Sequence, residues 1–356
     1  MHVQRLSESG RAMAEAEAKA AAGEAGAGAA AAAASAAAAA EALIPPPAAL
    51  RAAAELVMAR AARSILRQKK DDEEVKLTLL LNWPAPPAGT TAAAAAAAPA
   101  AGGSAPAPPA AGRLRLLCHA QALPAAPRPA AVVRAVACGT PRANARAKDS
   151  AWVRERRAAV ELAKRAAAAL DASTAANAGD ANANAAAAAA PAPSIPVEET
   201  LLVGPDGALE EGASSNFFVL TRDGALQTAG EDSVLPGTVR AVALDVARRG
   251  VAEGWPGWPV SRVEEGAAPR LGDASAWRAC FVSSTSRQLL RVDEVLDATG
   301  AAAAEAAGLP VPAPAVAFSV RGAAARPDEG VASLVAAVRD AILADSEPLP
   351  LDGAEE

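Results

Sequence analysis

Residues 211–240 read EGASSNFFVLTRDGALQTAGEDSVLPGTVR, and this segment decides the fold. It begins with an acidic residue, Glu211, which is followed five positions later by Asn216 and two phenylalanines. The apolar runs 217–220 and 225–228 flank an Arg-Asp-Gly turn, which predicts a β-hairpin. The segment therefore combines an acidic strand end with a hairpin directly after it.

The last six residues of this segment, LPGTVR at 235–240, predict a tight turn that opens a helix. Gly237 has no side chain, so another group can approach the backbone closely there. The backbone amides of Thr238 and Val239 would be unpaired at the helix N-terminus, which favours a bound phosphate. The pattern alone also fits an ordinary strand, loop and helix.

The composition of the whole chain excludes several classes of protein. The chain has 356 residues, which suggests about two domains, and most of its 52% hydrophobic content is alanine. Its 34 basic and 40 acidic residues give a net charge of −6, which argues against a nucleic-acid binder that relies on bulk positive charge. Three scattered cysteines and two histidines disfavour a disulfide scaffold and a metal centre, so no metal ligand is predicted.

Three low-complexity stretches rich in Ala, Pro and Gly interrupt the chain, at 22–48, 84–112 and 165–195. We expect them to be surface insertions or linkers, because such segments bury too little surface to offset chain entropy. No run of residues has the Leu, Ile and Phe content of a membrane span, and we expect a soluble protein.

Periodic segments between these stretches predict regular structure. Helices are expected over 50–65, 151–169, 237–249 (closed by Gly250) and 331–343. Strands are expected over 75–81, 113–123, 132–138, 199–203 and 280–283. Helices mixed with hairpins are typical of the α+β class.

The segment 211–240 resembles the signature of class IV aminotransferases, the pyridoxal 5′-phosphate (PLP) enzymes of fold type IV. That family includes branched-chain and D-amino-acid aminotransferases and 4-amino-4-deoxychorismate lyase. The matching positions are Glu211, Ala213, Asn216, Phe217, Phe218, Thr228, Leu235, Gly237 and Arg240. Thr238 departs from the pattern, because an aliphatic residue is usual there.

Two flanking segments extend the resemblance. Residues 145–156 (ARAKDSAWVRER) resemble the family's lysine segment, and residues 279–295 (ACFVSSTSRQLLRVDEV) resemble its late strand and turn. The lysine segment is most similar to that of the plant and algal D-amino-acid-aminotransferase-like group. The start of the chain, with His2 and Arg5, resembles a family helix that follows the first strands of the small domain. Those strands, and an arginine before His2 that reaches the cofactor phosphate in the family, have no counterpart here.

The resemblance assigns roles to individual residues. Lys148 would bind PLP as a Schiff base and move the proton between the substrate α-carbon and the cofactor. Glu211 would face the pyridine nitrogen and keep it protonated, which makes the ring an electron sink. The expected cofactor-binding residues are Lys148, Glu211, Gly237, Thr238, Val239, Ser284 and Thr285. We expect Asn216 to hold the loop, Arg240 to be structural and Arg287 to be a surface residue.

The resemblance also implies the domain organisation and the partners. An incomplete small α+β domain would span 1–140, a connector 141–147, the PLP-binding domain 148–346 and a tail 347–356. The implied substrates are an amino acid and a 2-oxo acid, and the implied assembly is a homodimer in the cytoplasm or a plastid. The expected reaction is amino-group transfer. A lyase acting on 4-amino-4-deoxychorismate, or a catalytically impaired protein of the same fold, remains an alternative.

Overall fold

The structure, a computed structural model, describes residues 9, 11–13, 45–70, 73–82, 115–123, 132–180, 195–320, 328–346 and 349. Its contacts divide the chain into two compact units. The smaller unit comprises Met1–Arg128, Ala147–Asp149 and Glu347–Glu356, and the larger comprises Pro129–Arg146 and Ser150–Ser346. The start of the chain, with His2 and Arg5, lies outside the described residues. So do most of the stretch 22–48, the stretch 84–112 and nearly all of the predicted tail.

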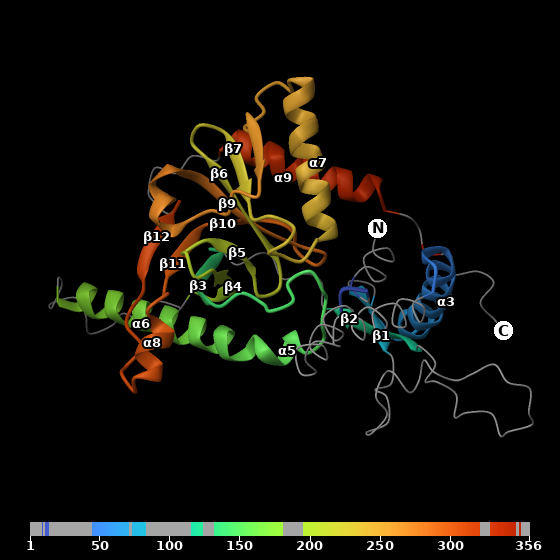
Figure 1. Cartoon of the computed structure of the whole chain (residues 1–356), viewed down its shortest axis with the longest axis horizontal. Helices are drawn as coiled ribbons and strands as arrows, with labels where there is room; N and C mark the ends of the chain where they lie inside the picture. The colour runs from blue at the N-terminus through green and yellow to red at the C-terminus, as the bar shows by residue number, and fades with distance from the viewer. Residues whose placement is uncertain are drawn as a thin grey trace, which may run out of the picture. The chain divides into compact units, whose positions relative to one another are not determined.

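The smaller unit contains one long helix and a two-stranded sheet (Figure 1). Helix α3 (Pro47–Leu66) begins with a proline in its first turn, where the missing amide proton is not needed. It buries Leu50, Ala54, Ala59 and Ala62, which lie at helical spacing. Strands β1 (Glu74–Asn82) and β2 (Arg115–Leu123) pair antiparallel. These elements confirm the helix and both strands that the sequence predicts in this part of the chain.

The larger unit is built on a sheet of ten strands in the order β10-β9-β6-β5-β4-β3-β11-β12, with β7 paired to β6 and β8. The strands are β3 (Arg134–Gly139), β4 (Val197–Val203), β5 (Leu209–Gly212), β6 (Asn216–Thr221), β7 (Ala225–Thr228), β8 (Arg262–Glu265), β9 (Trp277–Ser284), β10 (Gln288–Val292), β11 (Glu294–Asp297) and β12 (Ala315–Ser319). Strands β6 and β7 form the hairpin that the sequence predicts. Strand β3 pairs parallel with both of its neighbours, β4 and β11.

The sheet curls around an apolar core. Trp277 lies on β9 near one end of the strand order, and Phe318 lies on β12 at the other end. Their ring centroids are nevertheless 5.8 Å apart, and Phe217 packs against Trp277 at 6.3 Å. The two ends of the sheet therefore approach each other, and residues such as Leu201 and Val282 on the inner face are fully buried between them.

Helices cover the outer face of this sheet in two places (Figure 1). Helices α7 (Thr238–Glu253) and α9 (Glu329–Ala344) pack on a cluster that includes Phe218 and Phe281. Helices α6 (Arg157–Asp180) and α8 (Ala301–Ala306) pack on a second cluster that includes Val136 and Leu296. Two short segments complete the unit, helix α5 (Trp152–Glu155) and the 3₁₀ helix η2 (Leu271–Ala276).

The structure corrects three sequence-based predictions. The stretch 165–195 is not an insertion throughout, because α6 continues to Asp180 and buries Ala166 and Ala167 against the sheet. The predicted small domain 1–140 extends too far, because β3 is a central strand of the larger unit. Helix α7 ends at Gly254, whose φ of 63° forms a left-handed cap, and Gly250 lies inside the helix.

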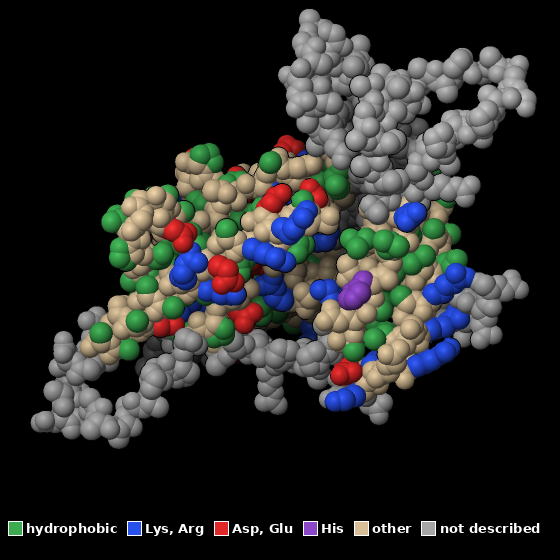
Figure 2. Space-filling model, turned by 90° about the horizontal axis from the view of Figure 1, so that it is seen from below, with side chains coloured by type: hydrophobic (Ala, Val, Ile, Leu, Met, Phe, Trp, Pro, Cys, Tyr) green, Lys and Arg blue, Asp and Glu red, His purple; other side chains and the backbone are tan. Residues whose placement is uncertain are grey.

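No helix within the described ranges has the length and apolar character that crossing a bilayer requires. On the face shown in Figure 2, acidic and basic side chains are interspersed in the left and central part, whereas several basic side chains follow one another along the right edge.

Candidate functional site

Four buried polar residues lie on the outer face of the sheet, between its two helix-covered parts. Glu211 on β5 is directly opposite Asn216 on β6, and Asn216 is directly opposite Ser283 on β9. Because side chains alternate along a strand, Asn216 and Ser283 share the face of Phe218 and Phe281, which contact α7 and α9. Thr200 on β4 is opposite Val136 and so faces the same side. None of the four residues is more than 4% exposed.

The carboxylate of Glu211 is buried and fully engaged. Its Oε1 accepts a hydrogen bond from Nε of Arg142 at 2.8 Å, and Nη2 of Arg142 lies at the same distance. Its Oε2 accepts a hydrogen bond from the backbone amide of Leu235 at 3.1 Å. Burial raises the pKa of Glu211, whereas the charge of Arg142 and both sets of hydrogen bonds lower it. The guanidinium of Arg142 also lies over the Trp152 ring, 5.6 Å from its centroid.

Asn216 holds the turn before α7. Its Nδ2 donates a hydrogen bond to the backbone carbonyl of Leu235 at 2.8 Å, which confirms that it fastens this loop. A Cβ on Gly237 would lie 2.2 Å from Oδ1 of Asn216, so only glycine fits there. The close approach that the sequence predicts at Gly237 is thus made by the asparagine side chain.

The first turn of α7 offers unpaired donors beside this asparagine. Gly237 is the N-cap and supplies no side-chain cap, and the first backbone amides of any helix have no intrahelical partner. Three buried hydroxyls have no hydrogen-bond partner in the described part of the chain, namely those of Thr200, Thr238 and Ser283. Leaving a buried hydroxyl unpaired costs free energy, so the hydroxyls of Thr238, in the first turn of α7, and Ser283, beside Asn216, suit a polar, anionic ligand. These observations fit the phosphate of PLP.

Arg240 stabilises the structure in the next turn of α7. It is 1% exposed, its Nη2 donates to the carbonyl of Ala229 at 2.8 Å, and its Nη1 pairs with Glu265 at 3.0 Å. This confirms the structural role expected from the sequence.

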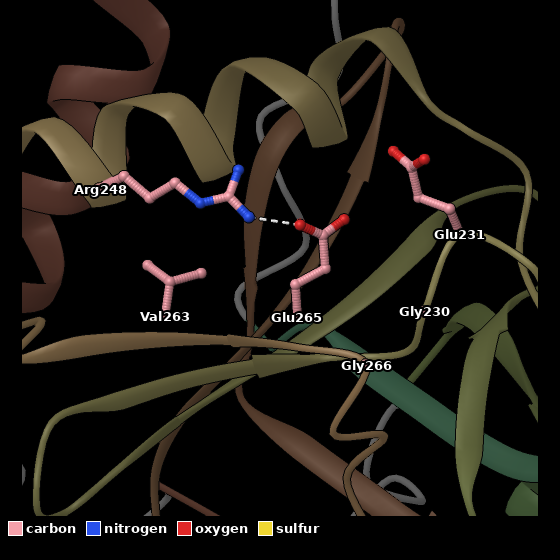
Figure 3. Close-up of a pocket in the computed structure, with 6 residues that line it drawn as sticks. All are labelled: Gly230, Glu231, Arg248, Val263, Glu265 and Gly266. Carbon is pink, nitrogen blue, oxygen red and sulfur yellow. Dashed lines mark hydrogen bonds and ion pairs between the residues drawn. The ribbon is translucent and has the colours of Figure 1, made fainter.

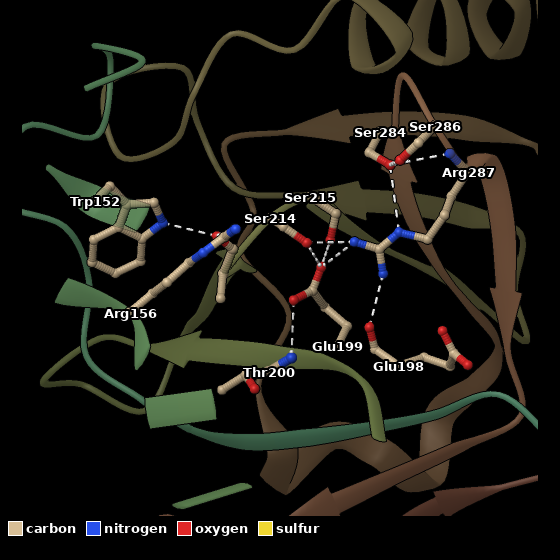
Figure 4. A network of polar contacts seen from close by, with 11 residues as sticks. Trp152, Arg156, Glu198, Glu199, Thr200, Ser214, Ser215, Ser284, Ser286 and Arg287 are labelled. Carbon is tan, nitrogen blue, oxygen red and sulfur yellow. Dashed lines mark hydrogen bonds and ion pairs between the residues drawn. The ribbon is translucent and has the colours of Figure 1, made fainter. Parts of the chain in front are cut away.

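The turn between β9 and β10 contains the remaining expected phosphate ligands. Thr285 is exposed, and Oγ of Ser284 accepts a hydrogen bond from the Arg287 backbone amide at 3.2 Å. The prediction that Arg287 is a surface residue is wrong, because its side chain is 20% exposed and pairs with Glu199 at 2.7 Å. Figure 4 shows Glu199 and Arg287 at the centre of a polar network that includes Ser214 and Ser215.

Lys148 belongs to the smaller unit, whereas Glu211 and α7 belong to the larger unit. The Lys148 side chain is exposed, and its backbone amide donates to Oγ of Ser9 at 3.3 Å. Of the expected site residues, the larger unit therefore contains Glu211, Gly237, Thr238 and Val239. It also contains Ser284 and Thr285, in the turn after Ser283.

Sequence reasoning missed two charged residues of this site. Arg142 lies in the segment 141–147, which was expected to be a connector, six residues before Lys148. Glu199 opens an apolar strand, where an acid usually marks the solvent-exposed strand end. Only the tertiary contacts reveal that both side chains are buried partners of other residues.

Two hollows lie on the larger unit. One, of about 580 Å³, is lined by the residues shown in Figure 3 and contains the ion pair of Arg248 and Glu265. The other, of about 370 Å³, is lined by the starts of α6 and β4 and includes Thr200 and Ser214. No group of three His, Cys, Asp or Glu side chains in the described ranges is arranged to hold a metal ion.

Comparison with known proteins identifies a family. A sequence model of amino-transferase class IV proteins matches residues 2–295. A search of the curated proteins found no significant match.

Solved structures resemble the chain only distantly. A hypothetical aminotransferase from Mycobacterium tuberculosis, in a PLP-bound form, is 17% identical, with 66% of each chain covered and a TM-score of 0.36. A branched-chain aminotransferase from Thermoproteus uzoniensis is 18% identical, with 66% of this chain and 59% of that chain covered and a TM-score of 0.37. A putative 4-amino-4-deoxychorismate lyase from Legionella pneumophila is 14% identical, with 65% and 64% covered and a TM-score of 0.37. The chain spans 66% or less of the length of these structures.

Proposed function

This chain belongs to the class IV aminotransferase family, and from that premise we propose that it is a PLP-dependent enzyme that transfers an amino group between an amino acid and a 2-oxo acid. One observation supports this most directly: a buried carboxylate, Glu211, lies on the same sheet face as the unpaired hydroxyl of Ser283 and next to the uncapped start of α7. A carboxylate and an anion site are what the two ends of PLP require.

Glu211 would hold a proton at the pyridine nitrogen of PLP. When bound, the cofactor supplies an electron sink for the pair of electrons left at the substrate α-carbon. A carboxylate favours the protonated ring only while it is itself ionised, and burial opposes ionisation. Arg142, at 2.8 Å, opposes this effect by lowering the pKa of Glu211, although burial is the larger effect and holds the pKa above its ordinary value. Oε2 accepts only the Leu235 amide and keeps a second lone pair, so Glu211 can accept a hydrogen bond from the ring N–H without releasing Arg142.

The start of α7 would bind the phosphate. The backbone amides of Thr238 and Val239 supply two donors, and the buried Oγ1 of Thr238 supplies a third. Thr285, which is exposed at the end of β9, would donate from the opposite side. Ser284 is the remaining expected ligand in this turn.

Lys148 would be the catalytic residue. Its amine would attach to the cofactor and move a proton at the substrate α-carbon. The Ser9 hydroxyl fixes the backbone of Lys148 by accepting from its amide at 3.3 Å.

Borohydride reduction of the PLP-saturated protein tests this assignment. Reduction makes the link between PLP and lysine permanent, so peptide mapping should find the label at Lys148. Lys164, which is exposed and paired with Glu161, is the internal control and should remain unlabelled. A label at Lys164 alone, or no label on any lysine, would refute the proposal.

Glu211→Gln tests the role of the carboxylate and the type of reaction. The neutral amide cannot hold the pyridine proton, so the variant should bind PLP but transfer amino groups at least about a hundredfold more slowly. Amino transfer is measured from an amino acid to a 2-oxo acid, and pyruvate release is measured from 4-amino-4-deoxychorismate. Pyruvate release without amino transfer would identify the lyase activity instead.

Two finer assignments extend this proposal. The lysine segment AKDSAWVRER favours the plant and algal D-amino-acid-aminotransferase-like group, so amino transfer from D-amino acids is the first to assay. Family resemblance also favours a homodimer, and sedimentation equilibrium would detect it.

A further inference from the structure

The carboxylate of Glu199 is the most heavily bonded group near the site. Its side chain is 4% exposed. Its Oε2 accepts hydrogen bonds from Ser214 Oγ at 2.8 Å and Ser215 Oγ at 2.6 Å, and its Oε1 accepts one from the Thr200 amide at 3.0 Å. A Cβ on Gly212 would lie 2.7 Å from this carboxyl group, so the position of Glu199 is tightly fixed.

Arg287 connects this carboxylate to the turn between β9 and β10 (Figure 4). Its Nη2 pairs with Glu199 at 2.7 Å and also donates to Ser214 Oγ. Its Nη1 donates to the backbone carbonyl of Glu198 at 2.9 Å. At the other end, its backbone amide donates to Oγ of Ser284 at 3.2 Å, and its Nε lies 3.4 Å from the same oxygen. One guanidinium therefore joins the start of β4, the turn after β5 and the turn after β9.

The backbone of this turn is strained. Gln288, the residue after Arg287, has a φ of 53°, and it is the one non-glycine residue with positive φ in the described ranges. This left-handed conformation costs an L-residue free energy and persists where surrounding contacts impose it. The contacts of Arg287 with Glu199, Glu198 and Ser284 are such contacts.

We infer that Arg287, fixed by Glu199, is a positioning residue that holds the turn 284–286 in the shape that binds the cofactor phosphate, with Thr285 as the ligand and Ser284 as part of the support. The inference rests on the proposed PLP site. It adds to the expected role of Ser284, because the hydroxyl oxygen of Ser284 accepts from Arg287 while its proton stays available to donate. The exposed Thr285 side chain is left to meet the phosphate.

Comparing PLP with pyridoxal tests this inference. The two molecules share the ring and the aldehyde, so the ratio of their dissociation constants isolates the contribution of the phosphate. Both are titrated by absorbance into the full-length protein and into Arg287→Met, Arg287→Lys and Glu199→Gln. Arg291→Met is the matched control, because Arg291 is an exposed arginine on the adjoining strand β10 that pairs with Asp293.

Arg287→Met and Glu199→Gln should each raise the dissociation constant of PLP about tenfold, as expected for a displaced charge-assisted contact, and that of pyridoxal less than about twofold. Arg287→Lys retains the charge but not the planar fork, so its effect should be intermediate. Arg291→Met should change neither constant.

Unchanged PLP affinity in Arg287→Met, or equal weakening of PLP and pyridoxal, would overturn the inference, because a purely structural role has no preference for the phosphate. If Arg287→Met does not fold, Glu199→Gln/Arg287→Met removes both buried charges together and is judged by the same ratio. If the unmodified protein binds PLP no better than pyridoxal, the proposed cofactor site itself fails, which is a different result from the loss of positioning.

Discussion

At the scale of single residues, the site depends on opposing effects at Glu211. Burial raises the pKa of its carboxyl group, and the adjacent Arg142 lowers it. The side chains of the pair are 8% and 4% exposed, so water screens their interaction little. The charge state that holds the pyridine proton therefore depends on an arginine that the proposed chemistry does not otherwise use.

Arg142→Met should make the stability of the protein depend more strongly on pH. Without the guanidinium, the pKa of Glu211 rises further above its value in the unfolded chain, so the native state binds more protons over that range. Stability then falls as pH rises through the interval between the two pKa values. Urea unfolding should show a larger loss of free energy relative to the unmodified protein at pH 8 than at pH 5. An equal loss at both values would show that Arg142 does not control this ionisation.

At the scale of elements, α7 shows how packing overrides helix propensity. Gly250 lies within this helix, and a Cβ at that position would lie 2.4 Å from Cε2 of Trp258. Trp258 in turn packs against Trp255, with ring centroids 4.9 Å apart. The glycine is retained for close contact with the indole rather than to end the helix.

Gly250→Ala should therefore destabilise the protein, although alanine is the better helix former. Propensity favours the change by roughly 1 kcal/mol, but overpacking against a ring typically costs 1–3 kcal/mol. We expect a net loss of about 1 kcal/mol in urea or thermal unfolding. Gly272→Ala is the control, because nothing lies within 4 Å of its added Cβ. A stabilised Gly250→Ala variant would mean that Trp258 moves aside without cost.

Part of helix α6 packs against the sheet, although its alanine-rich sequence does not predict this. Asp171, within the stretch that was expected to be an insertion, accepts a hydrogen bond from Nη1 of Arg134 at 2.9 Å. The Arg134 side chain is 2% exposed and also pairs with Glu294. Deleting residues 170–192 would therefore remove a partner of a buried charge.

Asp171→Ala should lower the free energy of unfolding by about 1–3 kcal/mol, because it leaves part of a buried guanidinium without a partner. Glu161→Ala is the matched control in the same helix. Glu161 pairs with Lys164, but both side chains are more than half exposed and screened by water, so its loss should have a much smaller effect. Equal effects measured by urea unfolding would place Asp171 outside the packed part of the helix.

At the scale of the whole molecule, the chain consists of two units, and the expected catalytic lysine is in a different unit from the expected cofactor cradle. Glu211, Asn216 and Ser283 are positioned by the sheet of the larger unit alone. In the proposed site, the phosphate and ring of the cofactor would therefore be held by residues of the larger unit.

PLP should raise the stability of the folded protein by mass action. At a free concentration of one hundred times the dissociation constant, the gain is about 2.7 kcal/mol, which corresponds to a rise of roughly 5–10 °C in the midpoint of thermal unfolding. Calorimetry should show a smaller rise with pyridoxal at the same concentration. Thr238→Val, which removes one buried donor, should reduce the PLP shift but not the pyridoxal shift. Equal shifts with both ligands would argue against a phosphate site at α7.

The sequence by itself determined the local elements and the identity of the most informative residues. The hairpin of β6 and β7, the strands β1, β2, β3, β4 and β9, and the helix that LPGTVR opens follow from periodicity and turn chemistry, which depend on neighbours within a few positions. Glu211, Asn216 and Gly237 can be recognised in the sequence for the same reason, because all three lie in the continuous segment 211–240.

Only the tertiary structure decided which residues those groups contact. Arg142 is 69 positions from Glu211, and Arg287 is 88 positions from Glu199, so no local pattern connects either pair. The tertiary fold brings the loops that carry Arg142 and Arg287 to the strands that carry Glu211 and Glu199, and little water is left to screen each pair. In the sequence the alanines of α6 resemble a low-complexity stretch, but in the structure they pack against β3. Their role depends on what they pack against, which the chain establishes only when it folds.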